Sequence, residues 1–423
     1  MHDIALIPDA IWDGRSDEAT SGVAVVIREG RIHDIVARGS LANDITTHPL
    51  PGCTLLPGLI DAHVHYSTAM GLSFLAAGVT TIRDVGNDLD WILDQRDRHA
   101  CDVSLGPRIV CCGVLHDGAR AYWRHMGRSH TDVEALRTSI QHHVDRGVDQ
   151  IKLYAHMPSD FTAAGVEESH RLGMFALAHL QKTSAEDACR AGLDGIEHLA
   201  GCDIAFAPAA EEELDALATL MLASNVWVDP TLVVWDRLGR INERSFFNDA
   251  RRAWVHPTHL DIWRRYLSRE KQPQSRLYWQ IAIPHLKRFM MRLHERGCRI
   301  GLGTDTPFPH LAPGFSVHDE LAMYVDAGMK PVDALRAATI HNAAMIGLGE
   351  QAGVIQRGAS ADLVAIRGNP LTQIDDISNI DMVWRAGHSF TPESLFTKAK
   401  RLAHQTLDDP ITLDLLRYVN GEQ

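Results

Sequence analysis

This sequence has few of the residues that hold small secreted proteins together. Only seven of its 423 residues are cysteine, they are scattered, and no Cys-x-x-Cys pair occurs. A disulfide framework and a thiolate zinc site are therefore not expected, and reduced thiols inside a cell fit this usage best. No uncharged run approaches the roughly 18 residues of a membrane span, and the first residues show neither a basic nor an apolar leader segment. We expect a cytoplasmic protein that does not enter a membrane.

Basic clusters are missing as well. Lys and Arg total 41 against 54 Asp and Glu, so the formal net charge is −13. Nucleic acids and anionic membrane surfaces attract basic patches, and neither partner is expected here. Apolar side chains, in contrast, are plentiful: the chain is 45% hydrophobic. That content can bury the core of two or three domains, or of one large barrel with an accessory domain.

Short β-rich runs occupy both ends of the chain. Two of them flank Glu29-Gly30 and predict a hairpin, and runs of the same character return after residue 353. Because a very different middle separates these ends, they predict one small β-sandwich domain built from both termini. We assign it residues 1–54 and 353–390, and we expect residues 391–423 to form a helical tail.

The middle of the chain alternates apolar strands with helical stretches, which is typical of parallel β/α units. This pattern predicts an α/β fold, a (β/α)8 TIM-like barrel over residues 55–352. Residues 235–290 carry aromatic and charged side chains at helical spacing, which predicts a helical insertion; plain helical packing and a lid over the site are the alternatives. The eight candidate strands are Thr54–His65, Val79–Val85, Arg108–Val114, Gln150–Ala155, Phe175–His179, Gly195–His198, Val226–Leu232 and Arg299–Asp305.

Polar side chains stand at the ends of these strands, where barrel enzymes carry their active sites. His63 and His65 end the first strand, and their imidazoles leave the same face because strand side chains alternate. A chain with 24 His contains about one His-x-His by chance, so this tripeptide alone is weak. Neutral imidazoles and a carboxylate without thiolates suit a divalent ion such as zinc. The later strand ends supply Lys152, His179, His198 and Asp305.

Lys152 is the unusual member of this set, because an ammonium group repels a cation. Apolar Ile151 and Leu153 flank it, which favours a desolvated amine with a lowered pKa. A neutral amine can add carbon dioxide and become a carbamate, an anionic ligand able to bridge two ions. A lysine that pairs with Asp305 or contacts the substrate is the other interpretation, and spacing alone does not decide between them.

Several motifs resemble the amidohydrolase superfamily of metal-dependent hydrolases, in its imidazolonepropionase-like and prolidase-like branch. The resemblance implies a barrel with a terminal β-sandwich, two metal ions and hydrolysis at a carbonyl carbon. It also implies that His63, His65 and Asp305 hold one ion, that His179 and His198 hold the second, and that a carboxylated Lys152 bridges them. The motifs are Leu56-Pro-Gly-Leu-Ile-Asp-Ala-His-Val-His65, Ala77-Gly-Val-Thr-Thr-Ile-Arg-Asp84, Ile151-Lys152, Ala178-His179, Asp194-Gly-Ile-Glu-His198, Gly303-Thr-Asp305 and Gly358-Ala-Ser-Ala-Asp-Leu-Val364.

The chemistry of such a site follows from its charges. Two neighbouring cations, zinc being the first choice, lower the pKa of a shared water and polarise the scissile carbonyl. Asp305 is expected to act as general base and then as general acid toward the leaving nitrogen; a role as ligand only, or as a helix cap, is the alternative. The sequence thus predicts an amidohydrolase that cleaves the C–N bond of a small N-acyl or peptide-like substrate, as an amidase or a dipeptidase.

Other functions stay open on the same residues. Hydroxide at this site also attacks carbamates, lactones and esters, and pocket shape rather than the ligand set chooses among them. A non-catalytic scaffold is the alternative from another class, although a structural barrel has no need of six convergent ligands. Formation of a homo-oligomer is not decided by the sequence.

Three residues are expected to contact the substrate. Tyr154 and His156 share the strand face of Lys152 and lie nearer the barrel mouth, although a core position suits Tyr154 equally well. His116 follows the third strand, where relatives often present a Gly-Gly-His motif. The glycines are partly missing here, which weakens the case for His116.

Overall fold

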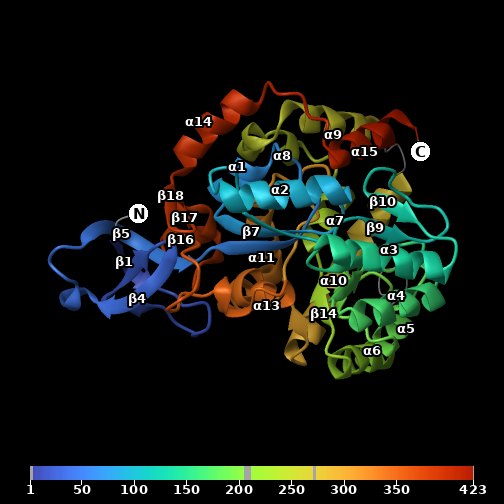
Figure 1. Ribbon diagram of the computed structural model, residues 1–423, viewed down its shortest axis with the longest axis horizontal. Coiled ribbons are helices and arrows are strands. Elements are labelled where there is room, and N and C mark those ends of the chain that lie inside the picture. Colours follow the sequence, from blue (N-terminus) through green and yellow to red (C-terminus); the bar gives the residue numbers. More distant parts are fainter. Residues whose placement is uncertain (1–2, 204–210, 270–272, 423) are drawn as a thin grey trace.

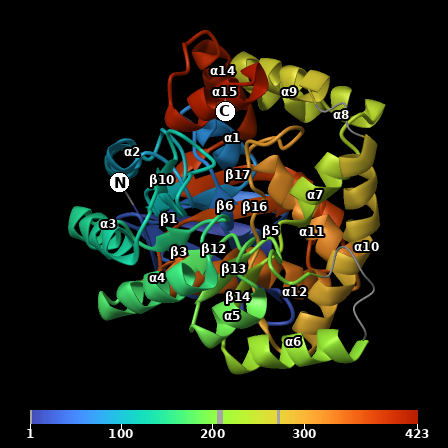
Figure 2. The same cartoon turned by 90° about the vertical axis from the view of Figure 1, so that its right-hand side faces the viewer.

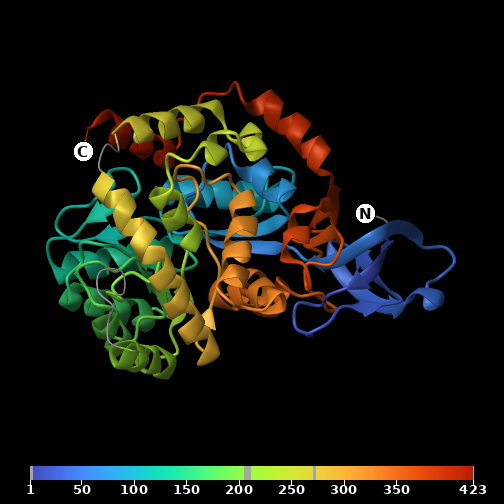
Figure 3. The same ribbon diagram turned by 180° about the vertical axis from the view of Figure 1, so that it is seen from behind.

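The computed structural model describes residues 3–203, 211–269 and 273–422. A small, mostly antiparallel sheet lies at one end of the molecule, and a larger body of strands wrapped in helices forms the rest (Figure 1). The two termini lie far apart, with the N-terminus at the small sheet and the C-terminus at the opposite end (Figures 1 and 3).

The small sheet combines strands from both ends of the chain. Its order is β18-β17-β16-β5-β1-β3-β4, with β2 paired to β1, and β16 runs antiparallel to β5. The predicted β-sandwich would consist of two sheets, whereas these strands form one mixed sheet. The domain boundaries stay a prediction. Leu6, Leu55 and Trp384 are buried in its core. The strands are β1 (Ile4–Ile11), β2 (Thr20–Ser21), β3 (Val23–Arg28), β4 (Arg31–Ala37), β5 (Thr46–Pro57), β16 (Leu363–Arg367), β17 (Ile380–Arg385) and β18 (His388–Phe390).

The strands of the larger body run parallel in two sheets, β6-β7-β8 and β10-β9-β11-β12-β13-β14-β15. Backbone hydrogen bonds join the sheet edges: the amide of Asp305 donates to the carbonyl of His63 at 2.8 Å, and that of Asp149 donates to Cys111 at 2.9 Å. Each of the eight predicted barrel strands overlaps one of these strands. They are β6 (Leu59–Val64), β7 (Val79–Asp84), β8 (Arg108–Cys111), β9 (Leu115–Asp117), β10 (Gly127–Ser129), β11 (Ile151–Leu153), β12 (Ala176–Ala178), β13 (Gly195–Glu197), β14 (Trp227–Asp229) and β15 (Arg299–Ile300).

The first predicted strand needs a correction, because residues 54–65 are not one strand. The chain leaves the small sheet at the end of β5 and enters the barrel at β6, with Gly58 between them. A Cβ atom at Gly58 would lie 2.1 Å from Oγ1 of Thr80, so only glycine allows this close approach.

Helices surround the barrel strands (Figure 2). Aspartates cap three of them: Asp88, Asp132 and Asp409 accept from backbone amides of the first turns of α2, α3 and α15. The helices are α1 (Gly71–Ala76), α2 (Leu89–Cys101), α3 (Val133–Arg146), α4 (Ser159–Arg171), α5 (Ala185–Arg190), α6 (Glu211–Ala223), α7 (Leu232–Gly239), α8 (Arg244–Phe247), α9 (Pro257–Arg269), α10 (Pro273–Glu295), α11 (Phe315–Asp326), α12 (Pro331–Arg336), α13 (Asn342–Met345), α14 (Pro392–Leu402) and α15 (Pro410–Asn420).

The described part of the predicted insertion, 235–290, is helical and holds α8, α9 and most of α7 and α10; residues 270–272 lie outside the described residues. The C-terminal tail follows β18 as α14 and then crosses the molecule, so that α15 lies beside α9 (Figures 1 and 3). Within the described ranges, no helix combines the length and the apolar character needed to cross a bilayer.

Candidate metal centre

A cavity of about 210 Å³ lies at the carboxyl ends of the barrel strands. His63 comes from the end of β6 and His65 directly follows that strand. Lys152 comes from β11, and the other three come from the residues that follow β12, β13 and β15. The structure thus gathers the six predicted ligands around one space, while ligation itself stays a prediction. The cavity is lined by His63, His65, Lys152, His179, His198 and Asp305, together with aromatic side chains.

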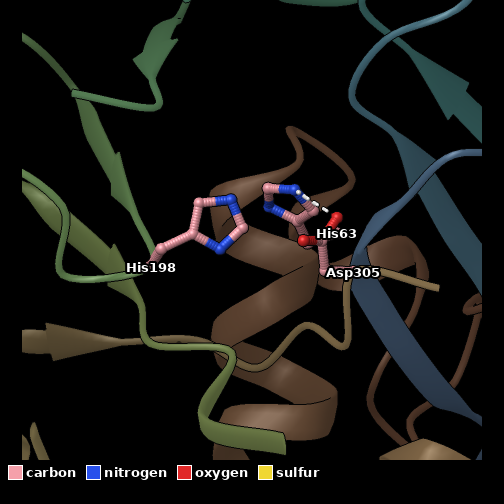
Figure 4. Close-up of side chains that lie close together, drawn as sticks. All are labelled: His63, His198 and Asp305. Carbon is pink, nitrogen blue, oxygen red and sulfur yellow. Dashed lines mark ion pairs between the residues drawn. The ribbon is translucent and has the colours of Figure 1, made fainter. Parts of the chain in front are cut away.

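The imidazoles and the carboxylate face one another closely. Oδ1 of Asp305 lies 3.5 Å from Nε2 of His63 and 3.5 Å from Nε2 of His65. His198 faces the same point from the opposite side (Figure 4), with its ring centre 4.4 Å from that of His63 and 4.6 Å from that of His179. His63, His198 and Asp305 each offer a ligand atom, and these atoms lie within 4.8 Å of one another.

In three of these histidines, the Nδ1 atom contacts an oxygen atom on the side away from the cavity. Nδ1 of His63 contacts the carboxylate of Glu197, Nδ1 of His65 lies 2.9 Å from the carbonyl oxygen of Gly86, and Nδ1 of His198 lies 2.6 Å from Oγ1 of Thr231. The Nε2 atoms are left for a ligand, which is the arrangement that orients histidines in metal sites.

Burial keeps the four imidazoles neutral. It lowers the pKa of His65 to about 4 and that of His179 to about 3, and it lowers the pKa of His63 and His198 well below the usual range. A neutral imidazole has a free lone pair on one nitrogen, so this donor set fits a divalent cation.

Lys152 is 1% exposed, and its Nζ has no hydrogen-bond partner among the described residues. Burial lowers the pKa of its amine and raises the pKa of the Asp305 carboxyl well above its usual value. An unsatisfied buried amine is costly. Its presence among the predicted ligands therefore fits a lysine whose amine adds carbon dioxide and then binds metal ions as a carbamate.

Two of the predicted ligands have a strained backbone. His198 has a φ of 66° and Asp305 a φ of 63°, both in the left-handed region. Residues other than glycine adopt this conformation at a cost of about 1 kcal/mol or more, and such residues cluster at functional sites. Leu199 and Thr231, beside or in contact with His198, also have positive φ values, of 56° and 43°.

A charged layer beneath the histidines was not assigned from the sequence. Arg83 is fully buried and donates to Oε1 of Glu197 at 2.9 Å, while Glu197 also contacts His63. Asp229 lies 3.8 Å from Arg83, and neither of its carboxylate oxygens has a hydrogen-bond partner within the described ranges. Arg83, Glu197 and Asp229 stand in β7, β13 and β14. A charged side chain inside a short apolar strand was the sequence signal that could have identified each of them.

The three residues predicted to contact the substrate lie in three different places. Tyr154 lines the cavity, and its hydroxyl accepts from Nε1 of Trp123 at 3.1 Å. His156 lines a separate outer cavity of about 700 Å³, and its Nδ1 lies 3.1 Å from the carbonyl oxygen of Arg120.

His116 is fully buried away from the cavity. Its ring packs against His143 of α3 at 4.6 Å and against His130 at 5.2 Å between ring centres. The side chain therefore lies toward the helical layer outside the strands, and the structure does not bring it to the ligand set.

Comparison with known proteins shows which proteins this chain is similar to. An uncharacterised protein of Mycobacterium tuberculosis is 26% identical over 377 residues, covering 82% of this chain and 90% of the relative. A 5-methylthioadenosine/S-adenosylhomocysteine deaminase of Natronomonas pharaonis is 24% identical over 385 residues, covering 82% and 81%.

Among solved structures, a Xaa-Pro dipeptidase with methionine bound in its active site superposes with a TM-score of 0.72 at 21% identity, covering 92% of this chain and 100% of the dipeptidase. That likeness shows the fold, a TIM barrel with a smaller domain. The sequence pattern of the amidohydrolase family matches residues 54–389. The resemblance found in the motifs is thereby confirmed, and the chain belongs to the amidohydrolase family.

Proposed function

We propose that this protein is a two-metal hydrolase that cleaves the amide C–N bond of a small N-acyl or peptide-like molecule. The observation that carries the proposal is the convergence of four neutral imidazoles, a buried carboxylate and an unpartnered buried amine on one cavity. Family membership supports a hydrolase that acts on C–N bonds. The names of two similar proteins, a dipeptidase and a deaminase, denote reactions that break such bonds.

The proposed ligand roles are those that the family resemblance implies. His63, His65 and Asp305 would hold one divalent ion, zinc being the first choice, His179 and His198 would hold the second, and a carboxylated Lys152 would lie between them. When bound, such ions supply an acidic water molecule and polarise a carbonyl oxygen. Members of this family generally use divalent metals.

The protein's own groups then move the proton and hold the geometry. Asp305 is proposed to take a proton from the attacking water on a carboxylate oxygen and to deliver it to the leaving nitrogen. The C–N bond breaks, a C–O bond forms, and the products are an acid and an amine. Glu197 and Arg83 keep His63 oriented from behind, so that the ligand set needs little rearrangement during the reaction.

Location and partner complete the proposal. We propose a small-molecule substrate and a cytoplasmic enzyme, in line with seven cysteines that are all free thiols. An ester or carbamate substrate would meet the same groups, so the bond type needs a direct test.

Metal removal is the first test. We expect the purified protein to carry about two divalent ions per chain, measured by elemental analysis. Chelation should lower amide hydrolysis at least 100-fold, and added zinc or manganese should restore it. His63→Ala should lose metal, whereas His388→Ala, at an exposed position in β18, should keep it. Full activity without bound metal would refute the mechanism, and preference for the ester of a matched amide–ester pair would refute the bond assignment.

A further inference from the structure

The inner cavity holds few charged groups besides the ligand set. Among the described residues that line it, Lys152 is the one Lys or Arg and Asp305 the one carboxylate. The rest of the lining is histidine, Gln181, and aromatic or aliphatic side chains. Aromatic rings form most of the lining besides the ligands: Tyr122, Trp123, Tyr154, Trp235, Tyr266, Phe308 and Tyr418.

This aromatic wall is assembled from segments far apart in the sequence. Tyr418 of α15 lies 6.0 Å from Trp123 and 5.4 Å from Tyr266 of α9 between ring centres, and it is nearly parallel to Tyr266, at 22°. Phe308, which follows β15, lies 6.4 Å from Trp123. The C-terminal helix thus supplies part of the cavity wall.

Hydrogen bonds hold this wall in place. The carboxylate of Asp414 in α15 accepts from the backbone amides of residues 124–126, which follow Trp123. Asp409 accepts from Ser67 at 2.7 Å, only two residues beyond His65. These two aspartates hold α15, and with it Tyr418, in place. The aromatic wall is therefore preformed, which reduces the entropy lost when a ligand binds.

Cationic groups do exist nearby, but they line the other cavity. Arg120, Arg124, Lys182 and Arg417 surround the outer cavity. Tyr122, Trp123 and Tyr418 line both cavities and therefore stand between the cationic side chains and the ligand set. An anionic group beside the scissile bond would have no guanidinium within the inner cavity, as far as the described lining extends.

This arrangement disfavours free dipeptides. The carboxylate of a dipeptide lies only a few bonds from its scissile carbon, so it would be buried in the inner cavity. Lys152 is the one Lys or Arg side chain in the described lining, and as the proposed carbamate it carries no positive charge. The proposed metal ions would be engaged by the ligand set, the attacking water and the scissile carbonyl, so they would not pair with a second carboxylate. A buried charge without a partner is strongly disfavoured.

We infer, on the basis of the proposed function, that the substrate is uncharged beside the scissile amide and carries an aromatic or similarly bulky apolar group. That group occupies the space bounded by Trp123, Tyr154 and Tyr418. The substrate class is therefore a neutral N-acyl amide or a blocked peptide, and free dipeptides are excluded by charge. Tyr418 is a specificity-determining residue supplied by the C-terminal helix.

Three compounds with the same type of scissile bond test this inference: N-benzoyl-alaninamide, N-benzoyl-alanine and N-acetyl-alaninamide. The zinc-loaded enzyme should hydrolyse the first at least tenfold faster, in kcat/KM, than either of the others. Faster cleavage of N-benzoyl-alanine would overturn the neutral-substrate inference, and equal cleavage of the two alaninamides would overturn the aromatic one.

Binding separates this inference from the proposed function. Trp123 and Trp235 line the cavity, so tryptophan fluorescence reports the affinity of each compound without turnover. Tightest binding of N-benzoyl-alaninamide supports the inference even if no compound is hydrolysed, an outcome that would speak against the proposed function alone. Tighter binding of N-benzoyl-alanine overturns the inference whatever the activity.

Variants locate the preference in the aromatic wall. Tyr418→Ala should reduce the benzoyl-over-acetyl preference about tenfold, and Tyr418→Phe should retain it, because the ring rather than the hydroxyl contacts the substrate. Phe247→Ala is the matched control, since this aromatic side chain is 44% exposed and lies outside the cavity lining. Trp123→Leu is a second test if Tyr418→Ala does not fold. An unchanged preference in a folded Tyr418→Ala or Trp123→Leu protein contradicts the assignment.

Discussion

Arg83 shows how one residue holds the metal centre from below. Its guanidinium is fully buried and donates to the carbonyl oxygen of Ala62 at 2.5 Å, to Gln150 at 3.1 Å and to Glu197 at 2.9 Å. Ala62 immediately precedes His63, and Glu197 precedes His198. One side chain therefore ties the strands that carry two of the predicted ligands.

Removal of that charge should be costly. We expect Arg83→Met to lower the free energy of unfolding by about 3–5 kcal/mol, because it leaves the buried carboxylate of Glu197 without its cation. Urea denaturation measures the change. Arg264→Met is the control, since the Arg264 side chain is 77% exposed and should change stability by less than about 0.5 kcal/mol. A loss below about 1 kcal/mol for Arg83→Met would show that the charged layer is not structural.

Replacement of Lys152 should affect both metal content and activity. We expect Lys152→Ala to bind fewer metal ions and to lose at least 100-fold in activity, because its proposed carbamate supplies the bridging oxygens. Short carboxylates such as propionate should restore part of the activity by filling the space. A carbamate signal in the NMR spectrum after growth with 13C-bicarbonate checks the modification directly. Exposed Lys182 provides the matched Lys182→Ala control; a Lys152→Ala protein with full metal content would refute the bridge.

At the scale of elements, α15 acts as a brace between the tail and the barrel. Its residues contact the loop after β9 through Asp414, and Thr412 lies 2.9 Å from Nε2 of His259 in α9. Asp414 accepts from three consecutive backbone amides, which is the environment that orders a loop.

Loss of this carboxylate should release the loop. We expect Asp414→Ala to lower the free energy of unfolding by about 1–3 kcal/mol, because one buried amide and two partly buried amides lose their acceptor. Hydrogen exchange of residues 124–126 should accelerate at least tenfold, while β11 and β12 stay protected. Asp408→Ala, at an exposed neighbouring position, should leave exchange unchanged. Equal protection in Asp414→Ala would mean that the loop is held by other contacts.

At the scale of the whole molecule, buried ionisable groups set the response to pH. Burial raises the pKa of Asp84 to about 7 and that of Glu320 to about 8, so the folded state binds protons there that the unfolded chain releases above pH 4.5. These acids increase stability as the pH falls from about 8. Buried histidines act in the opposite direction, because burial lowers their pKa: His99, His143, His310 and His318 to about 4, and His259 to about 3.

The two groups together predict a stability maximum near neutral pH. Below about pH 6.5 the unfolded chain protonates its histidines while the folded chain does not, so each buried histidine removes on the order of 1 kcal/mol by pH 5. Urea denaturation across pH 4.5–8 measures the profile. His318→Asn should flatten the acid limb, and His388→Ala, at an exposed position, should not. Stability that rises steadily toward pH 4.5 would contradict this prediction.

The six predicted ligands line one cavity because their positions in the sequence reflect a regular property of barrels. Residues at the carboxyl ends of parallel strands meet at one edge, so the order of His63, Lys152, His179 and Asp305 along the chain was enough to gather them. The same reasoning did not locate His116. It lies in β9, a three-residue strand paired with β10 and β11, and the sequence does not show which face such a short strand turns toward the barrel.

By itself, the sequence indicated the barrel order and the candidate ligand residues, because strand alternation and β/α succession are local properties read from neighbouring residues. Its motifs indicated the family. Only the tertiary structure decided that Arg83 lies under His63 and that Tyr418 of the tail faces the cavity beside Trp123. Contacts between segments so far apart arise from how whole elements pack. No local sequence pattern predicts that packing. The inferred substrate preference depends on it, because the packing forms the aromatic wall of the cavity.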